Sequence, residues 1–254
     1  MFLRVRVGFP AFALRNPMSE SDFDVASLAA YLHITPQQVQ KLAKRDEIPH
    51  RRVNGKLQFP RPEIHHWMEE RMGVLDDVQL AAVEGRLEKE HQASVVEDTT
   101  VEVAKWLSVD SISVPLAART RKSAISTMAQ LAAETGILWD ADKMTAAVTA
   151  REELQSTAMD NGVALLHPRR PLPSILGDNL LALGIAGQGI PFGGSRTLTD
   201  VFFLVCSMDD RSHLRVLARI ARIISNESLL EEIRAAGDAT SVYECICEAE
   251  SNLT

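Results

Sequence analysis

The chain has 254 residues, of which 46% are hydrophobic and 24% charged, and it carries a net charge of −7 and three cysteines. That is long enough to bury a core in one large domain or two small ones. No stretch approaches the roughly 20 uninterrupted apolar residues of a membrane helix, and the cysteines are too few and too clustered for a disulfide framework or a zinc site. We therefore expect a cytoplasmic protein without metal or cofactor.

The charge is unevenly distributed along the chain. Residues 1–72 hold 11 lysines and arginines against 8 acidic residues, whereas the remainder holds 16 against 26. An acidic rear part argues against nucleic acid binding there and leaves any such contact to the front. The first 21 residues mix apolar positions with Arg4, Arg6 and Arg15, which makes a poor secretory signal. We interpret them as a disordered extension, with Met18 as an alternative start.

Three helices and a hairpin are predicted in residues 22–73. Apolar positions at helical spacing follow Asp24, and Thr35-Pro36 provides an N-cap and a first-turn proline for a second helix that runs to about Arg45. Asn54-Gly55 is the strongest short hairpin signal and predicts a wing over 48–59. Arg61-Pro62 then opens a third helix. The pattern is typical of a winged helix-turn-helix domain.

Residues 74–106 predict a helical linker, with a flexible break most favoured at 94–100. From Val109 the pattern changes to mixed α/β architecture. Helices are predicted at about 119–135, 142–154, 212–225, 228–236 and 240–249, and strands at 162–166, 180–186 and 198–206. Cys206 ends the apolar run of the last strand, which predicts a buried small side chain.

One histidine stands out because of its place in this pattern. The predicted strand 162–166 ends at His167, which is followed by Pro168 and by Arg169 and Arg170. Strand ends are where α/β folds keep their functional sites. His167 is therefore a candidate functional residue.

Residues 107–254 resemble the enzyme IIA domain of the fructose/mannitol and nitrogen-regulatory branch of the bacterial phosphotransferase system. The resemblance rests on five segments: Arg151-Glu152, Ser156-Thr157, Gly162 to His167, Ile190 to Gly193, and Val201 to Val205 leading into Asp210 to Leu214. It implies a three-layer α/β (α+β) fold with a mixed sheet. It also implies that His167 accepts a phosphoryl group from the phosphocarrier HPr or its nitrogen-branch relative, with His213 and Arg151 assisting.

Phosphoryl transfer between imidazoles needs a neutral ring nitrogen aimed at phosphorus, and cationic or N–H donors around the equatorial oxygens. We expect a neutral, solvent-reachable His167 with His213 nearby, and backbone N–H groups of the helix at His213 open to phosphate. Ser156, Thr157 and Arg169 are candidate phosphate ligands. Three alternatives remain open. The two hydroxyls could have turn or capping roles, and the arginine could be a solvated loop charge. Gly193-Gly194 could simply be needed for a positive φ.

Residues 24–72 resemble the excisionase-like branch of the MerR family, whose helix-turn-helix and wing bind DNA. Between residues 41 and 61, seven basic residues face only Asp46 and Glu47. We expect the basic residues to contact DNA phosphates and the glutamines to contact base edges. A single module would need a dimer or tandem sites for specific binding. A module kept only for protein interaction is the alternative. The candidate nucleic-acid-binding residues are Gln37, Gln38, Lys41, Lys44, Arg45, Arg51, Arg52 and Lys56.

Together these features predict a regulatory phosphocarrier rather than a turnover enzyme. Its expected partners are an HPr-like protein and DNA, with a homodimer as a further possibility. Two alternatives stay open: a sugar-uptake enzyme IIA subunit, and a transcription regulator that senses an anion without covalent chemistry.

Overall fold

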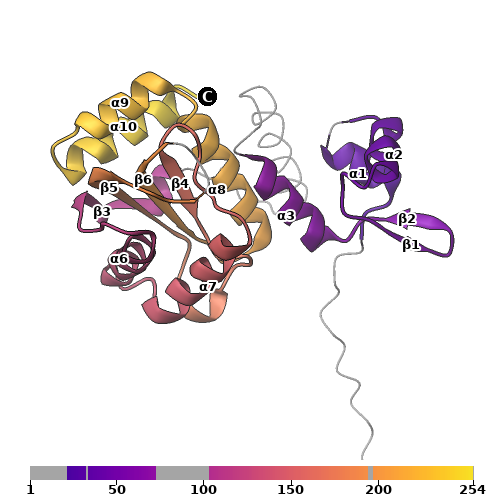
Figure 1. The fold of residues 1–254 in the computed structure, drawn as a ribbon, viewed down its shortest axis with the longest axis horizontal. Coiled ribbons are helices and arrows are strands. Elements are labelled where there is room, and N and C mark those ends of the chain that lie inside the picture. The colour runs from indigo at the N-terminus through magenta and orange to yellow at the C-terminus, as the bar shows by residue number, and fades with distance from the viewer. Residues whose placement is uncertain (1–21, 33, 73–102, 194–196, 254) are drawn as a thin grey trace, which may run out of the picture. The chain divides into compact units, whose positions relative to one another are not determined.

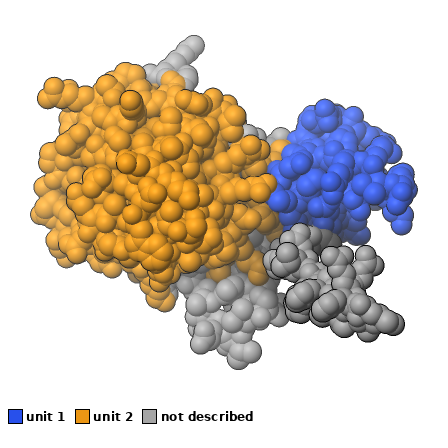
Figure 2. Space-filling model, turned by 90° about the horizontal axis from the view of Figure 1, so that it is seen from below, with its two compact units in different colours: residues 1–30, 34–64 blue, residues 31–33, 65–254 orange. Residues whose placement is uncertain are grey.

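The computed structural model describes residues 22–32, 34–72, 103–193 and 197–253. The chain divides into two compact units, residues 1–30 with 34–64 and residues 31–33 with 65–254, which Figure 2 distinguishes by colour. The expected extension 1–21 and nearly all of the expected linker lie outside the described residues. Within those residues, no helix has both the length and the apolar character to cross a bilayer.

The first unit contains α1 (Val25–Leu32), α2 (Pro36–Lys44), β1 (Arg51–Val53), β2 (Lys56–Gln58) and the start of α3 (Arg61–Met72). A capping box begins α2: the Thr35 side chain accepts from Gln38 N, and the Gln38 side chain accepts from Thr35 N. Asn54 and Gly55 have φ of 51° and 76°, as the tight turn between antiparallel β1 and β2 requires. The predicted helix-turn-helix and hairpin are confirmed.

This unit buries a small core of its own. Phe23 and Phe59 exchange two backbone hydrogen bonds of 2.9 Å, which close the hairpin end onto the start of α1. Their rings are buried together with apolar side chains of the helices and of the turn before the hairpin. The other buried members are Leu28, Ala29, Val39, Ala43, Ile48 and Ile64.

The second unit is built on a four-stranded sheet in the order β3-β5-β6-β4. Its strands are β3 (Leu107–Leu116), β4 (Val163–Leu166), β5 (Leu180–Ile190) and β6 (Thr199–Cys206). β3 is parallel to β5, and β4 is parallel to β6, whereas β5 and β6 are antiparallel. The predicted mixed sheet is confirmed.

Helices cover both faces of this sheet (Figure 1). α6 (Arg121–Glu134) and α7 (Ala141–Leu154) lie on one face, where they enclose a core with alternate strand residues such as Leu166, Ala182 and Leu204. α8 (Asp210–Ile223), α9 (Glu227–Ala235) and α10 (Ala239–Ser251) lie on the other. The five helices begin and end within two residues of their predicted bounds, because N-cap residues such as Thr120, Asp140 and Asn226 mark their starts.

Two elements were not predicted: strand β3 and the 3-10 turn η1 (Pro173–Ile175). The one-turn helix α5 (Val103–Trp106) lies at the end of the predicted helical linker. β3 lies at an edge of the sheet and contains serines, Asp110 and Pro115. An edge strand tolerates proline and polar side chains because only one side of its backbone is paired. The apolar alternation that marks a half-buried strand is therefore weak in this segment.

Cys206 is fully buried at the end of β6, as predicted, and desolvation raises the pKa of its thiol from 9.0 to about 12. Between pH 9 and 12 the unfolded chain loses this proton while the folded chain keeps it. We expect the free energy of unfolding to fall by about 1.4 kcal/mol per pH unit over that window and to show no such dependence below it. Denaturation of wild type and Cys206→Ala measures this difference, and parallel pH curves would contradict it.

Candidate phosphoryl-transfer site

The sheet topology brings His167 and His213 together. β4 and β6 are parallel neighbours with Leu166 opposite Leu204, so both strands end at the same edge of the sheet. His167 follows β4 directly, and α8 starts only a few residues after β6 and carries His213 in its first turn. The two ring centroids are 5.1 Å apart, and the ring planes meet at 63°. The expected proximity of the two imidazoles is confirmed.

The environment of His167 defines its tautomer. Nδ1 lies 2.8 Å from the carbonyl oxygen of Leu165. A carbonyl oxygen only accepts, so Nδ1 carries the proton and the lone pair of the neutral ring is on Nε2. The expectation of a solvent-reachable ring is wrong, however, since His167 is only 3% exposed. A phosphodonor therefore has to gain access to the ring.

His213 is positioned by a serine that the sequence reasoning missed. Ser207, buried directly after β6, places its Oγ 2.8 Å from Nδ1 of His213. The second ring nitrogen of His213, Nε2, is the one that the Ser207 contact does not engage. A hydroxyl both donates and accepts, so this contact orients the ring without selecting one tautomer.

The start of α8 is capped by a side chain. Asp209 Oδ1 accepts from the backbone N–H groups of Arg211 at 3.0 Å and of Ser212 at 2.9 Å. The expectation that these N–H groups are open to a phosphate is thus wrong. Asp209 is an ordinary N-cap, and its carboxylate already occupies the position that an anion would take.

Arg151 lies in the last turn of α7 and is 3% exposed. Its Nη1 donates to the Gln155 carbonyl at 2.8 Å, while its buried Nε has no hydrogen-bond partner among the described residues. Buried polar groups are normally satisfied, so a donor left over in this way indicates a missing acceptor. This makes Arg151 a donor suited to a phosphoryl oxygen.

Glu152 organises the segment that follows α7. Its fully buried carboxylate accepts from the backbone N and the hydroxyl of Thr157, and Arg121 Nη2 lies 3.4 Å away. The Thr157 carbonyl in turn lies 3.5 Å from Leu165 N, on β4. Glu152 therefore holds this segment beside the strand that ends at His167. Sequence reasoning noted Glu152 only within a motif and missed Arg121 altogether.

The two candidate hydroxyls have structural partners. Ser156 Oγ accepts from Ala158 N at 3.2 Å, which is a turn contact, and the Thr157 hydroxyl donates to Glu152. Gly193 has a φ of +84°, and a side chain there would collide with Ser156. The need for positive φ is confirmed at Gly193, while Gly194 lies outside the described residues. Arg169 is exposed on the loop after Pro168. Phosphate binding by Ser156, Thr157 and Arg169 stays a prediction.

All eight candidate nucleic-acid-binding residues are exposed in the first unit. Three of them already have partners: Gln38 Oε1 accepts from Thr35 N at 2.7 Å, Arg51 forms an ion pair with Asp22, and Arg45 Nη1 lies 3.7 Å from the Glu47 carboxylate. A base contact by Gln38 would compete with the capping box, because one oxygen serves both. The remaining cations extend from α2 onto both strands of the hairpin.

Comparisons with known proteins find matches for both parts of the chain. Residues 105–249 match the family described as "Phosphoenolpyruvate-dependent sugar phosphotransferase system, EIIA 2", and residues 23–72 match the helix-turn-helix domain family. The nitrogen regulatory protein of Klebsiella oxytoca is 26% identical over 161 residues, covering 61% of this chain and 96% of that protein. That of Escherichia coli K12 is 25% identical over 159 residues, covering 60% and 94%.

Solved structures show the same fold for the second unit. The nitrogen regulatory protein IIA-Ntr of Neisseria meningitidis superposes with a TM-score of 0.51 at 19% identity, over 57% of this chain and 98% of that one. A PTS IIA domain structure from Streptococcus pyogenes gives the same score and identity, over 59% and 97%. At this identity the likeness concerns the fold alone.

Proposed function

This chain belongs to the phosphotransferase-system EIIA 2 family and carries an N-terminal helix-turn-helix domain, and from that premise we propose that it is a regulatory phosphocarrier. His167 accepts a phosphoryl group from an HPr-like phosphohistidine protein, and its phosphorylation state governs DNA binding by the N-terminal module. The observation that carries the proposal is the pair of facing imidazoles, with Nδ1 of His167 tied to a carbonyl.

The hydrogen bond from Nδ1 explains how His167 would act. Nε2 attacks phosphorus with its lone pair while the P–N bond of the donor breaks and returns its electron pair to the donor ring. His167 keeps its Nδ1 proton and becomes positively charged, and the Leu165 carbonyl stabilises that charge. No external base is needed for these steps, since the attacking nitrogen carries no proton and the transfer releases none.

His213 and Arg151 would stabilise the transferring group. The Ser207 contact holds His213 with its ring next to His167, from where Nε2 can donate to an equatorial oxygen. Arg151 offers a buried N–H donor and a permanent positive charge. Such donors act most strongly where water is excluded, which the burial of all three side chains provides.

A regulatory role is favoured over sugar uptake by the attached module. Its exposed cations on α2 and the hairpin suit contacts with a DNA backbone. Two modules in one chain permit coupling, because the negative charge of the phosphoryl group exceeds the positive charge gained by the ring and so changes the net charge of the protein. A homodimer would supply the second DNA contact that a module of this size needs for specific binding.

The test is phosphorylation of the full chain with enzyme I, an HPr-like phosphocarrier and phosphoenolpyruvate. Intact mass spectrometry should show one added phosphoryl group in wild type and none in His167→Ala. His213→Ala should still accept the group, at a rate lowered about 100-fold by loss of a transition-state donor. His50→Ala is the matched control for labelling and should accept one phosphoryl group, as wild type does. Undiminished labelling of His167→Ala would refute the proposal.

Coupling is tested on the same samples. Binding of a fluorescent DNA duplex should depend on salt and should differ in affinity between the phosphorylated and unphosphorylated chain. If duplex binding is present but equal in both forms, the carrier function stands without coupling to DNA. If no salt-dependent binding occurs, the transcription-factor part fails.

A further inference from the structure

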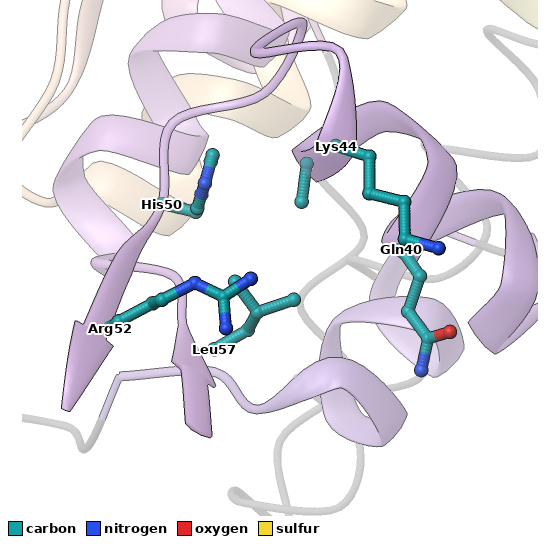
Figure 3. A pocket seen from close by; sticks show the side chains of 6 residues that line it. Gln40, Lys44, His50, Arg52 and Leu57 are labelled. Atoms are coloured by element: carbon teal, nitrogen blue, oxygen red, sulfur yellow. The ribbon is translucent and has the colours of Figure 1, made fainter. Parts of the chain in front are cut away.

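A small hollow opens on the surface of the first unit, between α2 and the hairpin (Figure 3). Its volume is about 110 Å³. Gln40 and Lys44 extend along one side, with His50 and Arg52 across from them, and Leu57 lies below. Ala43, which is buried, completes the lining. Polar groups from three segments of the chain thus converge over an apolar floor.

The side chains that line the hollow give it a positive charge. Lys44 and Arg52 are permanent cations, Gln40 adds an amide, His50 adds an imidazole, and no carboxylate is among the lining residues. Asp46 Oδ1 lies 3.9 Å from His50 Nδ1, but its side chain is 95% exposed, so water screens its charge. The hollow therefore attracts anions.

The C-terminus of α2 repels an anion in the hollow, but only weakly. Lys44 is the last residue of this helix, and a helix C-terminus carries a partial negative charge worth about 0.3–1 kcal/mol at an exposed site. Its last carbonyls are also occupied, since Lys41, Leu42 and Ala43 accept from the N–H groups of Arg45, Asp46 and Glu47. Two full positive charges outweigh this residual dipole.

The size of the hollow restricts its ligand. Its volume is far below the several hundred Å³ of a pocket that encloses a nucleotide or a drug-sized molecule. A group of the size of one phosphate is therefore the anion that suits it. Lysine as a point charge and arginine as a planar fork are the side chains that recognise phosphate oxygens.

From this convergence we propose that the hollow seats a single backbone phosphate of a DNA duplex. Lys44 and Arg52 supply the charge, and the amide of Gln40 supplies a hydrogen bond. His50 borders the hollow without donating to the phosphate, because its Nδ1 lies 3.0 Å from the Ile48 carbonyl and donates to it, so the neutral ring has no second N–H. One phosphate held between helix and hairpin would fix how the module is placed on the duplex. The inference rests on the DNA-binding part of the proposed function.

The salt dependence of duplex binding by the full chain tests this inference. Lys44→Gln and Arg52→Gln should each weaken binding about tenfold, as expected for a charged hydrogen bond. If both side chains hold the same phosphate, Lys44→Gln/Arg52→Gln loses less than the product of the single losses. In the double variant, the slope of log affinity against log salt should then be smaller in magnitude than in wild type by about 1, the value for one phosphate, rather than by 2. Lys122→Gln, an exposed lysine of α6, is the charge-matched control.

The outcomes separate this inference from the proposed function. Additive losses with a slope change near 2 would mean two separate phosphates, and wild-type affinity in the double variant would mean none; either result overturns the inference alone. A complete absence of duplex binding in wild type overturns the DNA-binding function as well. Isothermal titration with inorganic phosphate distinguishes the source of the anion. The hollow is a site for free anions if wild type binds inorganic phosphate at millimolar concentration, the double variant does not, and both bind the duplex with equal affinity. That combination overturns the proposal.

Discussion

Replacing Glu250 by alanine is expected to lower the free energy of unfolding of the second unit by about 3–5 kcal/mol, the cost of breaking a buried ion pair. The Glu250 carboxylate accepts from Val103 N at 2.7 Å, Ala104 N at 2.9 Å and Arg219 Nε at 3.1 Å. Its side chain and that of Arg219 are 7% and 6% exposed, respectively. Without the carboxylate, a buried guanidinium loses its counter-charge and two backbone donors of α5 lose their acceptor.

Urea denaturation monitored by circular dichroism measures this loss. Glu248→Ala changes an exposed glutamate of the same helix and should shift stability by less than about 0.5 kcal/mol. Arg219→Met/Glu250→Leu removes both charges and should recover much of the loss, because an apolar pair of similar volume avoids the desolvation cost. Equal stability of the Glu250 and Glu248 variants would show that the ion pair contributes nothing.

Gly193→Ala is expected to destabilise the second unit by about 2–4 kcal/mol and to slow phosphoryl acceptance. The φ of +84° costs about 1–2 kcal/mol for a residue with a side chain. A Cβ at this position would also come closer than 3.0 Å to both Oγ and Cβ of Ser156, and such overpacking adds about 1–3 kcal/mol. Relief requires the end of β5 to move away from the segment that Glu152 holds beside β4.

Gly136→Ala is the matched control for backbone strain. Gly136 has a φ of +77° with nothing within 4 Å of the added Cβ, so it should show the strain without the collision. Gly193→Ala/Ser156→Gly should recover the steric part of the loss. If Gly193→Ala and Gly136→Ala lower the free energy of unfolding equally, the close approach of Gly193 to Ser156 contributes nothing to stability.

Local sequence signals account for most of the predicted elements. Thr35 with Gln38, Asn54 with Gly55, and the N-caps of the later helices act over two to four residues, so their effect is visible in the sequence alone. His167 also became a candidate through local pattern, a strand end followed by a proline, whereas the role expected for it came from the family resemblance. β3 was missed because an edge strand with proline carries little of the apolar alternation that reveals a strand.

By itself the sequence determined the two-part organisation, the type and bounds of nearly all predicted elements, and the choice of His167 and His213 as candidates. Only the tertiary structure decided that the rings meet, that His167 is buried, that Asp209 closes the start of α8, and that Ser207 and Glu152 position the site. The difference is one of range. Capping and turn formation depend on neighbours in the chain, whereas burial and pairing depend on which strands become adjacent, as in the hydrogen bond that Glu250 forms with Val103 across 147 residues.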